Sequence, residues 1–227
     1  TTNSEQLGAL LLADNLVEIL GTGQVDIEPA VQVLTGADNS NIKIQAGTLN
    51  IAGTVYAGAS LDQDDDVIWT GRNADLEIDT TGRITIGGQG FNDAGQLVDR
   101  GGSIKATGTV DINVATTAAG IDLVLSSLSS ITSDSSGGGV LSGTLGTSTI
   151  LISASSSIQI FGGIQSYDDG SDVTITSGSQ LYIDGYIEAE DALSLTGGTH
   201  GSGVSIFITR LEYLTIATDV DGRFINS

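Results

Sequence analysis

The sequence predicts an all-β protein in which short strands stack into a solenoid. The main observation is that five apolar residues recur twenty-three positions later in the same order: Ile150, Ile152, Ile158, Ile160 and Ile164 return as Val173, Ile175, Leu181, Ile183 and Ile187. Within each set the apolar residues alternate with polar ones, which is typical of strands with one buried face. A pattern that returns at a fixed period of about twenty residues indicates coils that bury their inner faces against one another.

Composition supports the same fold class. The chain has 227 residues, of which 32 are Gly and one is Pro, and Ser and Thr fill most of the gaps between apolar residues. This favours many short strands joined by tight turns. With only four Phe, five Tyr and one Trp, the interior must be narrow and aliphatic.

The N-terminal residues 1–40 are expected to hold a cap or docking segment followed by the first coil. Residues 4–20 have helical spacing, with Ser4 as a possible N-cap and Gly21 as a stop, which favours a short capping helix. Such a helix would cover an open sheet edge. The alternative is that residues 16–27 already form the first coil.

Residues 41–227 are expected to form the solenoid, with about eight coils in all. The predicted inward residues are Ile42, Ile44, Leu49, Ile51, Val55, Leu76, Ile78, Ile84, Ile86, Ile104, Ala106, Val110, Ile112, Val114, Val204, Ile206, Ile208, Leu214 and Ile216. Loop inserts are predicted near 58–66, 88–102, 126–148 and 188–203. The Ser- and Gly-rich insert at 126–148 is interpreted either as a loop excursion or as a coil with Ser and Gly ladders.

Charge restricts the partners. Seven Lys and Arg oppose 28 Asp and Glu, giving a formal net charge of −21. A surface of this charge repels nucleic acid and anionic membranes, so neither is expected as a partner. It attracts cations instead. The absence of Cys and Met from an acidic, Gly/Thr/Ser-rich chain is typical of a bacterial extracellular protein, and the missing first Met suggests processing or a fragment.

Three acidic clusters are candidate calcium sites, because carboxylates gathered in a turn supply the oxygen ligands that calcium prefers. Their residues are Asp62, Asp64, Asp65 and Asp66, then Asp168, Asp169 and Asp172, and finally Asp219 and Asp221. The first cluster is the best candidate, since four like charges repel unless a cation or solvent separates them. The alternative is that all three are solvated turns.

Two tracts carry a resemblance to a known family. GGSIKATGTVDINVATTAAGIDLVLSS and STILISASSSIQIFGGIQS are similar to the degenerate repeats of large bacterial exoproteins, of the filamentous-haemagglutinin and giant-adhesin kind. The similarity extends over about 41–216 and lies in a pattern, without an invariant motif. It implies a right-handed parallel β-helix, secreted and used as an adhesin stalk, surface fibre or matrix subunit. The calcium-binding repeat G-G-x-G-x-D is absent.

The alternative function is a polysaccharide hydrolase. Asp168 and Asp169, followed by His200 and then Arg210, resemble in their order the paired aspartate, histidine and arginine of polygalacturonase-like β-helix enzymes. Two carboxylates could act as acid and base around a water. The glycine before the histidine and the lysine after the arginine are missing, however. Trp69 is the one candidate sugar platform, but beside Val67 and Ile68 it is expected in the core.

The sequence therefore predicts a structural protein without enzymatic activity. Its expected partners are further copies of itself, joined head-to-tail into a homopolymer or fibre, or a surface glycan. Calcium is the one cofactor expected, and the expected location is the cell surface or the extracellular space.

Overall fold

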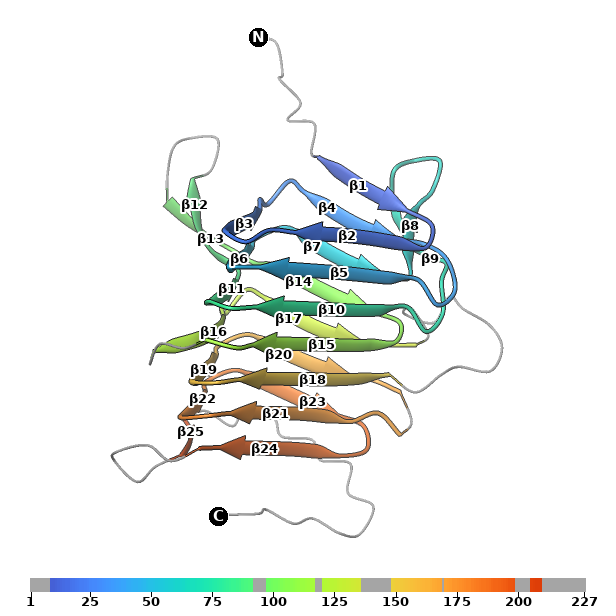
Figure 1. Cartoon of the computed structure of the whole chain (residues 1–227). Coiled ribbons are helices and arrows are strands. Elements are labelled where there is room, and N and C mark those ends of the chain that lie inside the picture. Colours follow the sequence, from blue (N-terminus) through green and yellow to red (C-terminus); the bar gives the residue numbers. More distant parts are fainter. Residues whose placement is uncertain are drawn as a thin grey trace.

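A computed structural model describes residues 9–91, 97–116, 120–135, 148–168, 170–198 and 205–209. Over these residues the chain is all-β, with 25 strands and no helix. Twenty-one of the strands form three parallel sheets of seven strands each (Figure 1).

We name the three sheets A, B and C. Sheet A contains β1 (Leu10–Ala13), β4 (Gln32–Thr35), β7 (Thr54–Ala57), β14 (Ser103–Ala106), β17 (Ser130–Ser133), β20 (Gly163–Ser166) and β23 (Tyr186–Ala189). Sheet B contains β2 (Leu16–Leu20), β5 (Asn41–Ala46), β10 (Asp75–Thr80), β15 (Thr109–Val114), β18 (Thr149–Ala154), β21 (Val173–Ser177) and β24 (Leu193–Gly197). Sheet C contains β3 (Gln24–Ile27), β6 (Thr48–Ile51), β11 (Ile84–Ile86), β16 (Ile121–Leu125), β19 (Ser157–Ile160), β22 (Leu181–Ile183) and β25 (Ile206–Ile208).

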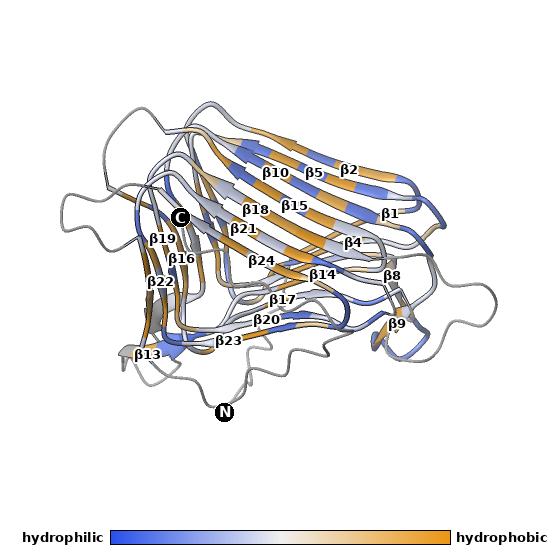
Figure 2. Cartoon of the chain, turned by 90° about the horizontal axis from the view of Figure 1, so that it is seen from below, coloured by the Kyte–Doolittle hydropathy of each residue, from blue (hydrophilic) through white to orange (hydrophobic). Residues whose placement is uncertain are grey.

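The chain visits the sheets in the constant order A, B, C. Each passage adds one strand to every sheet, and the described residues contain seven such coils, against about eight expected. Viewed along the stack, the three sheets surround a common interior (Figure 2). Inward and outward residues alternate along most strands, as the period-two pattern predicts, and a β-bulge interrupts the alternation in β16 between Ile121 and Leu123.

The repeat that led to this prediction is confirmed residue by residue. All five apolar pairs are register partners on adjacent parallel strands: Ile150 with Val173, Ile152 with Ile175, Ile158 with Leu181, Ile160 with Ile183, and Ile164 with Ile187. The interior is a continuous aliphatic cluster. The predicted inward residues from Ile42 to Val114 are all buried, whereas Ile206 is half-buried and Ile208 is 40% exposed. Val204, Leu214 and Ile216 lie outside the described residues.

The expected capping helix is wrong over residues 10–20, which form strands β1 and β2. Both strands pair in parallel with the next coil, β1 with β4 and β2 with β5. That pairing satisfies one edge of each strand and places Val17 and Ile19 against the core, which a free helix would not do. The alternative reading of a first coil therefore holds. Residues 4–8 lie outside the described part of the chain.

Two of the four predicted inserts are antiparallel hairpins: β8 (Ala59–Leu61) with β9 (Val67–Trp69), and β12 (Gly88–Phe91) with β13 (Leu97–Arg100). The predicted bounds of the other two inserts, 126–148 and 188–203, include residues that belong to strands. Residues 130–133 form β17 and residues 193–197 form β24, so both stretches belong to coils. Their outward Ser and Thr residues obscured the alternation. Residues 136–147 and 199–204 lie outside the described chain.

Candidate functional site

The outer face of sheet A gathers aromatic and hydrogen-bonding side chains over the last three coils. Outward positions of neighbouring strands line up across a parallel sheet, here those on β17, β20 and β23. We call this surface the polar–aromatic face and define it by Thr132, Gln165, Tyr167, Tyr186 and Glu188. Tyr167 is 46% exposed, and the other four are half-buried.

Glu188 links the side chains of this face. Its Oε2 accepts a hydrogen bond of 3.3 Å from Gln165 Nε2 and another from the Tyr186 hydroxyl. Burial and the carboxylate of Glu188 raise the pKa of Tyr186 to about 12, and burial also raises the pKa of Tyr167. Both phenols therefore stay protonated near neutral pH. Gly163, in register with Tyr186, has open space where a side chain would stand.

The β8–β9 hairpin folds onto the same sheet closer to the N-terminal coils. The Trp69 ring lies 5.3 Å from the Tyr56 ring, between centroids, and Lys105 Nζ lies 4.3 Å from the Trp69 centroid. The same ammonium group lies 3.2 Å from Asp134 Oδ2. Leu34, on the outward side of β4, is fully buried because β8 packs there. Trp69 is thus half-buried outside the solenoid core, where the sequence placed it inside.

The first acidic cluster forms the turn of this hairpin. Asp62 Oδ1 accepts hydrogen bonds from the backbone N–H groups of Asp64, at 2.9 Å, and Asp66, at 3.0 Å. Asp65 adopts a left-handed backbone with φ of 62°, a conformation that Asp tolerates better than most residues. All four side chains are exposed. The Asp62 carboxylate therefore stabilises the turn itself.

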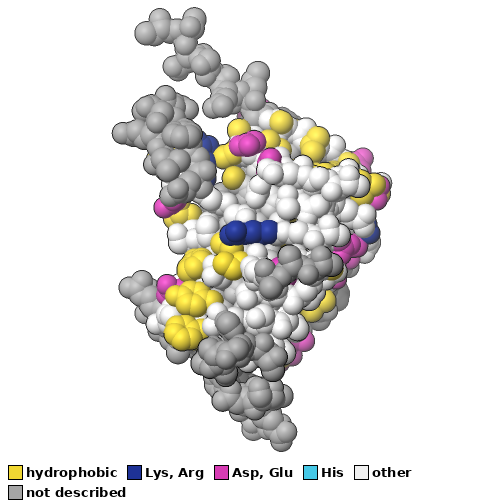
Figure 3. All heavy atoms as spheres, turned by 60° about the vertical axis from the view of Figure 1, so that its left-hand side comes forward, with side chains coloured by type: hydrophobic (Ala, Val, Ile, Leu, Met, Phe, Trp, Pro, Cys, Tyr) yellow, Lys and Arg dark blue, Asp and Glu magenta, His cyan; other side chains and the backbone are white. Residues whose placement is uncertain are grey.

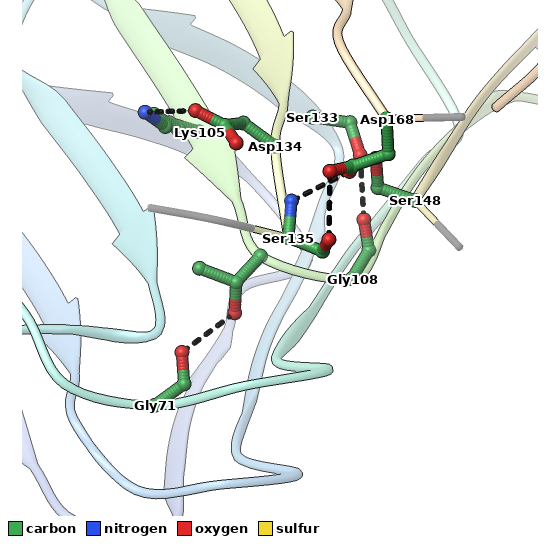
Figure 4. A network of polar contacts seen from close by, with 9 residues as sticks. Gly71, Lys105, Gly108, Ser133, Asp134, Ser135, Ser148 and Asp168 are labelled. Carbon is green, nitrogen blue, oxygen red and sulfur yellow. Dashed lines mark hydrogen bonds and ion pairs between the residues drawn. The ribbon is translucent and has the colours of Figure 1, made fainter. Parts of the chain in front are cut away.

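The second cluster is divided between different roles. Asp168 is buried, and its carboxylate accepts hydrogen bonds from Ser135 N at 2.6 Å, Ser135 Oγ at 2.7 Å and the Ser148 hydroxyl (Figure 4). These partners lie on both sides of the corner between sheets A and B. Asp172 Oδ1 accepts from Ala192 N at 3.2 Å in the following coil. Asp168 thus ties a corner together, and its donors leave it little freedom to bind anything else.

The remaining predicted residues cannot be placed. Asp169, Asp219 and Asp221, together with His200 and Arg210 of the enzyme alternative, lie outside the described residues. In the described ranges, no group of three or more His, Cys, Asp or Glu side chains is arranged to hold a metal ion. Calcium binding stays a prediction.

Aspartates at the corners link successive coils, and sequence reasoning missed most of them. Asp38 Oδ1 accepts from Arg72 N at 2.8 Å, and Asp75 Oδ1 accepts from Thr109 N at 2.7 Å. Asp122 is 2% exposed and accepts from Ser156 N at 2.6 Å. The signal that could have found them is position, since each of these Asp residues precedes the first buried apolar residue of a strand by a few positions at most.

Sheet B carries carboxylates on its outer face. Glu77 accepts from Lys43 Nζ at 2.8 Å, and Asp111 stands in register with Glu77 on the next strand. Partial burial raises the pKa of Asp111, and the charges of Asp79 and Glu77 raise it further. An open groove of about 370 Å³ lies at the end of this sheet, and Gln45, Asp79 and Asn113 supply polar side chains to it.

The outer face of sheet C carries an aromatic ladder. Ring centroids of Phe161 and Tyr182 lie 5.6 Å apart, and those of Tyr182 and Phe207 lie 5.8 Å apart. Hydrophobic side chains gather on this side of the molecule toward the C-terminal coils (Figure 3). The Tyr182 and Phe207 rings are nearly parallel, at an interplanar angle of 9°, and Phe207 is 45% exposed.

Comparison with models of known families, with curated proteins and with solved structures gives no significant match. In the part of the chain that the structure describes, no helix has the length and apolar character needed to cross a membrane. The class of the protein therefore follows from its geometry, as an all-β chain of three stacked parallel sheets.

Proposed function

We propose that this chain is a structural and adhesive extracellular protein, of the kind found on bacterial surfaces, built as a right-handed parallel β-helix. The observation that carries the proposal is the sevenfold return of the chain to the same three sheets around an aliphatic core. In a fold with this architecture, the outward faces and the two ends of the stack are the surfaces available for binding.

Chain connectivity supports the handedness. Successive strands of each sheet are parallel and joined by a crossover through the other two sheets. Connections of this kind between parallel strands of one sheet are right-handed in about 98% of cases, because the strands themselves twist right-handedly.

The distribution of aromatic residues supports an adhesive role. Every described aromatic side chain lies outside the aliphatic core, on the outer faces of sheets A and C: Tyr56, Trp69, Phe161, Tyr167, Tyr182, Tyr186 and Phe207. The polar–aromatic face combines exposed ring surface with Gln and Glu groups. Sugars present both C–H faces, which pack on rings, and hydroxyls, which pair with amides and carboxylates. Glu188, Asp134 and the net charge of −21 disfavour an anionic polymer, so we infer a neutral or amino-sugar glycan.

Affinity electrophoresis through gels that contain neutral, amino-sugar or uronate polysaccharides tests this proposal. Tyr167→Ala is expected to weaken retardation about fivefold to tenfold in a gel that retards the wild type, because one ring–sugar contact is lost. Phe207→Ala is the matched control, since Phe207 on sheet C is 45% exposed and Tyr167 is 46% exposed. Equal losses for both variants, or no retardation of the wild type in any gel, would count against a glycan site on sheet A.

The hydrolase alternative receives no specific support from the described residues. Asp168 is buried and holds hydrogen bonds from Ser135 and Ser148, whereas a catalytic acid or base must reach substrate or water. Release of reducing ends from any polysaccharide of the panel by the wild-type chain would restore this alternative.

A further inference from the structure

The two ends of the stack present the same pattern of inward residues. Following each inner row through the seven coils connects Val17 to Leu193 and Ile19 to Leu195 in sheet B. The same procedure connects Val25 to Ile206 and Ile27 to Ile208 in sheet C. In sheet A it connects Leu11 to Ile187 and Ala13 to Ala189. Large aliphatic residues correspond to large ones, and alanine corresponds to alanine.

The backbone N–H and C=O groups that have no partner among the described residues also alternate in matching phase at the two ends. Asn15 O accepts from Asn41 N and Gly21 N donates to Gln45 O, both at 2.8 Å. Because alternate residues of a strand face each neighbour, the N–H and C=O groups of Leu16, Glu18 and Leu20 point to the open edge. On β24, Ala192 O accepts from Val173 N at 2.9 Å.

The residues of β24 that face the open edge are by the same alternation Leu193 and Leu195. In every internal pair of sheet B the inward residues of the earlier strand bond the outward residues of the later one. If β2 of a second copy lay beside β24, the backbone groups of inward Leu193 and Leu195 would pair with those of outward Glu18 in this same arrangement.

Among the described residues, the strands at the two ends lack the Lys and Pro that often protect an open sheet edge, and their charged side chains are Glu18, Asp26 and Glu188. The end strands β1, β2 and β3, and at the other end β23, β24 and β25, each have one neighbour among the described strands and contain neither Lys nor Pro. Exposed edges are normally blocked by such residues. Instead the first coil exposes large apolar side chains at 44–61% of their surface: Leu10, Leu11, Leu12, Leu16 and Leu20.

We propose that the β1–β2–β3 end of one copy docks on the β23–β24–β25 end of a second copy, so that all three sheets and the aliphatic core continue across the junction. The partner is thus a second copy of this chain, bound head-to-tail. This inference rests on the proposed structural function and specifies how its subunits join. Such a heterologous contact does not close, so it produces rods.

The outward rows agree with this register despite the acidity of the chain. Across the junction Glu18 stands beside Ser194, Asp26 beside Phe207, and Glu188 beside Leu12. None of these strand positions sets one carboxylate against another. Among the described residues, like charges meet at one corner of the junction, where Asp14 would lie beside Glu190.

Sedimentation velocity over a range of concentrations tests the junction with full-length variants. The wild type is expected to form a ladder of oligomers, seen as rods by negative-stain microscopy. Glu18→Pro removes an N–H that faces the open edge and that has no partner among the described residues, so it should weaken association at least about tenfold. Glu18→Ala keeps this N–H and is the matched control, expected to associate like the wild type.

Charge at position 194 identifies the partner end. Ser194 is exposed on β24, so changing it leaves the core intact. Ser194→Glu should weaken association and Ser194→Lys should strengthen it, each about two- to fivefold, because Glu18 of the next copy lies beside it. Adding Glu18→Lys to Ser194→Glu should restore wild-type association.

A wild type that stays monomeric at every concentration, or association unaffected by both positions, would overturn the junction. Glycan retardation that persists in such a monomer would leave the adhesive proposal standing. The two proposals can therefore fail separately.

Discussion

At the scale of single residues, corner glycines decide how closely successive coils approach. A Cβ on Gly162 would lie 2.3 Å from Ser129 O and 2.4 Å from Ser126 O of the preceding coil. Its neighbour Gly163 has no atom within 4 Å of the same position. A side chain at position 162 would therefore clash with the preceding coil, whereas one at position 163 would not.

We expect Gly162→Ala to lower the free energy of unfolding by about 1–3 kcal/mol, because the added methyl group forces the coils apart. Gly163→Ala is the control and should change stability by less than about 1 kcal/mol. Urea denaturation followed by circular dichroism measures both. Equal effects at the two positions would contradict this account of the corner.

Asp111 illustrates how an outward carboxylate opposes folding. Its pKa is raised by partial burial and by the charges of Asp79 and Glu77, so the folded chain holds this proton more tightly than the unfolded chain. Stability contributed by the neutral group is therefore lost as the pH rises from about 3.9, the unfolded pKa, through the folded value.

Asp111→Asn should consequently raise the melting temperature at pH 7, and the difference should vanish when the pH falls below about 3. Asp26 provides the opposite case, because hydrogen bonds from Asn50 and Gln24 lower its pKa. Its charged form is favoured by folding, so Asp26→Asn should lower the melting temperature at pH 7. Thermal melts of both variants at the two pH values are the measurement, and the same sign for both would refute the assignment.

At the scale of elements, the β8–β9 hairpin is an addition to the solenoid. It pairs only with itself in sheet topology and is held to sheet A by Trp69 against Tyr56 and Lys105. Trp69 is the only tryptophan in the chain, so its fluorescence in the folded protein reports on the surroundings of the hairpin.

Tyr56→Ala should move the Trp69 emission maximum to longer wavelength, since the indole ring loses its cover. The melting temperature of the β-sheets, followed by circular dichroism, should change little, because the solenoid strands pair without the hairpin. Combined fluorescence and circular dichroism melts distinguish the two signals. Tyr182→Ala, which removes a ring on sheet C, is the control that should leave the emission unchanged.

At the scale of the whole molecule, a net charge of −21 opposes both folding and association. Salt screens this repulsion, and the Debye length falls from about 30 Å at 0.01 M to about 8 Å at 0.15 M. Raising NaCl over this range should therefore raise the melting temperature and strengthen self-association. A fall in either quantity would mean that salt weakens attractive ion pairs more than it screens the net repulsion. CaCl₂ at equal ionic strength separates screening from calcium binding, which would add a further rise.

The residues that line the interior of the coils could be assigned from the amino-acid sequence alone. Inward residues such as Ile42 and Val110 could be assigned because their strands have one buried face, and burial on one face leaves an alternating pattern in the chain. The twin segments even predicted the register, since the partner of each isoleucine lies one coil later. The apolar residues within 10–12 and 16–20 were ambiguous, because at an end coil both a helix and a strand would bury some of them.

The arrangement of the side chains outside the core could be learned only from the three-dimensional fold. Tyr167, Tyr186 and Glu188 come together on one face because coils of unequal length return to the same sheet, and outward positions carry no periodic signal. The roles of Asp62 and Asp168 likewise depend on which backbone N–H groups surround them in space. The inner pattern is repeated along the chain, whereas the outer surfaces arise only where separate coils meet.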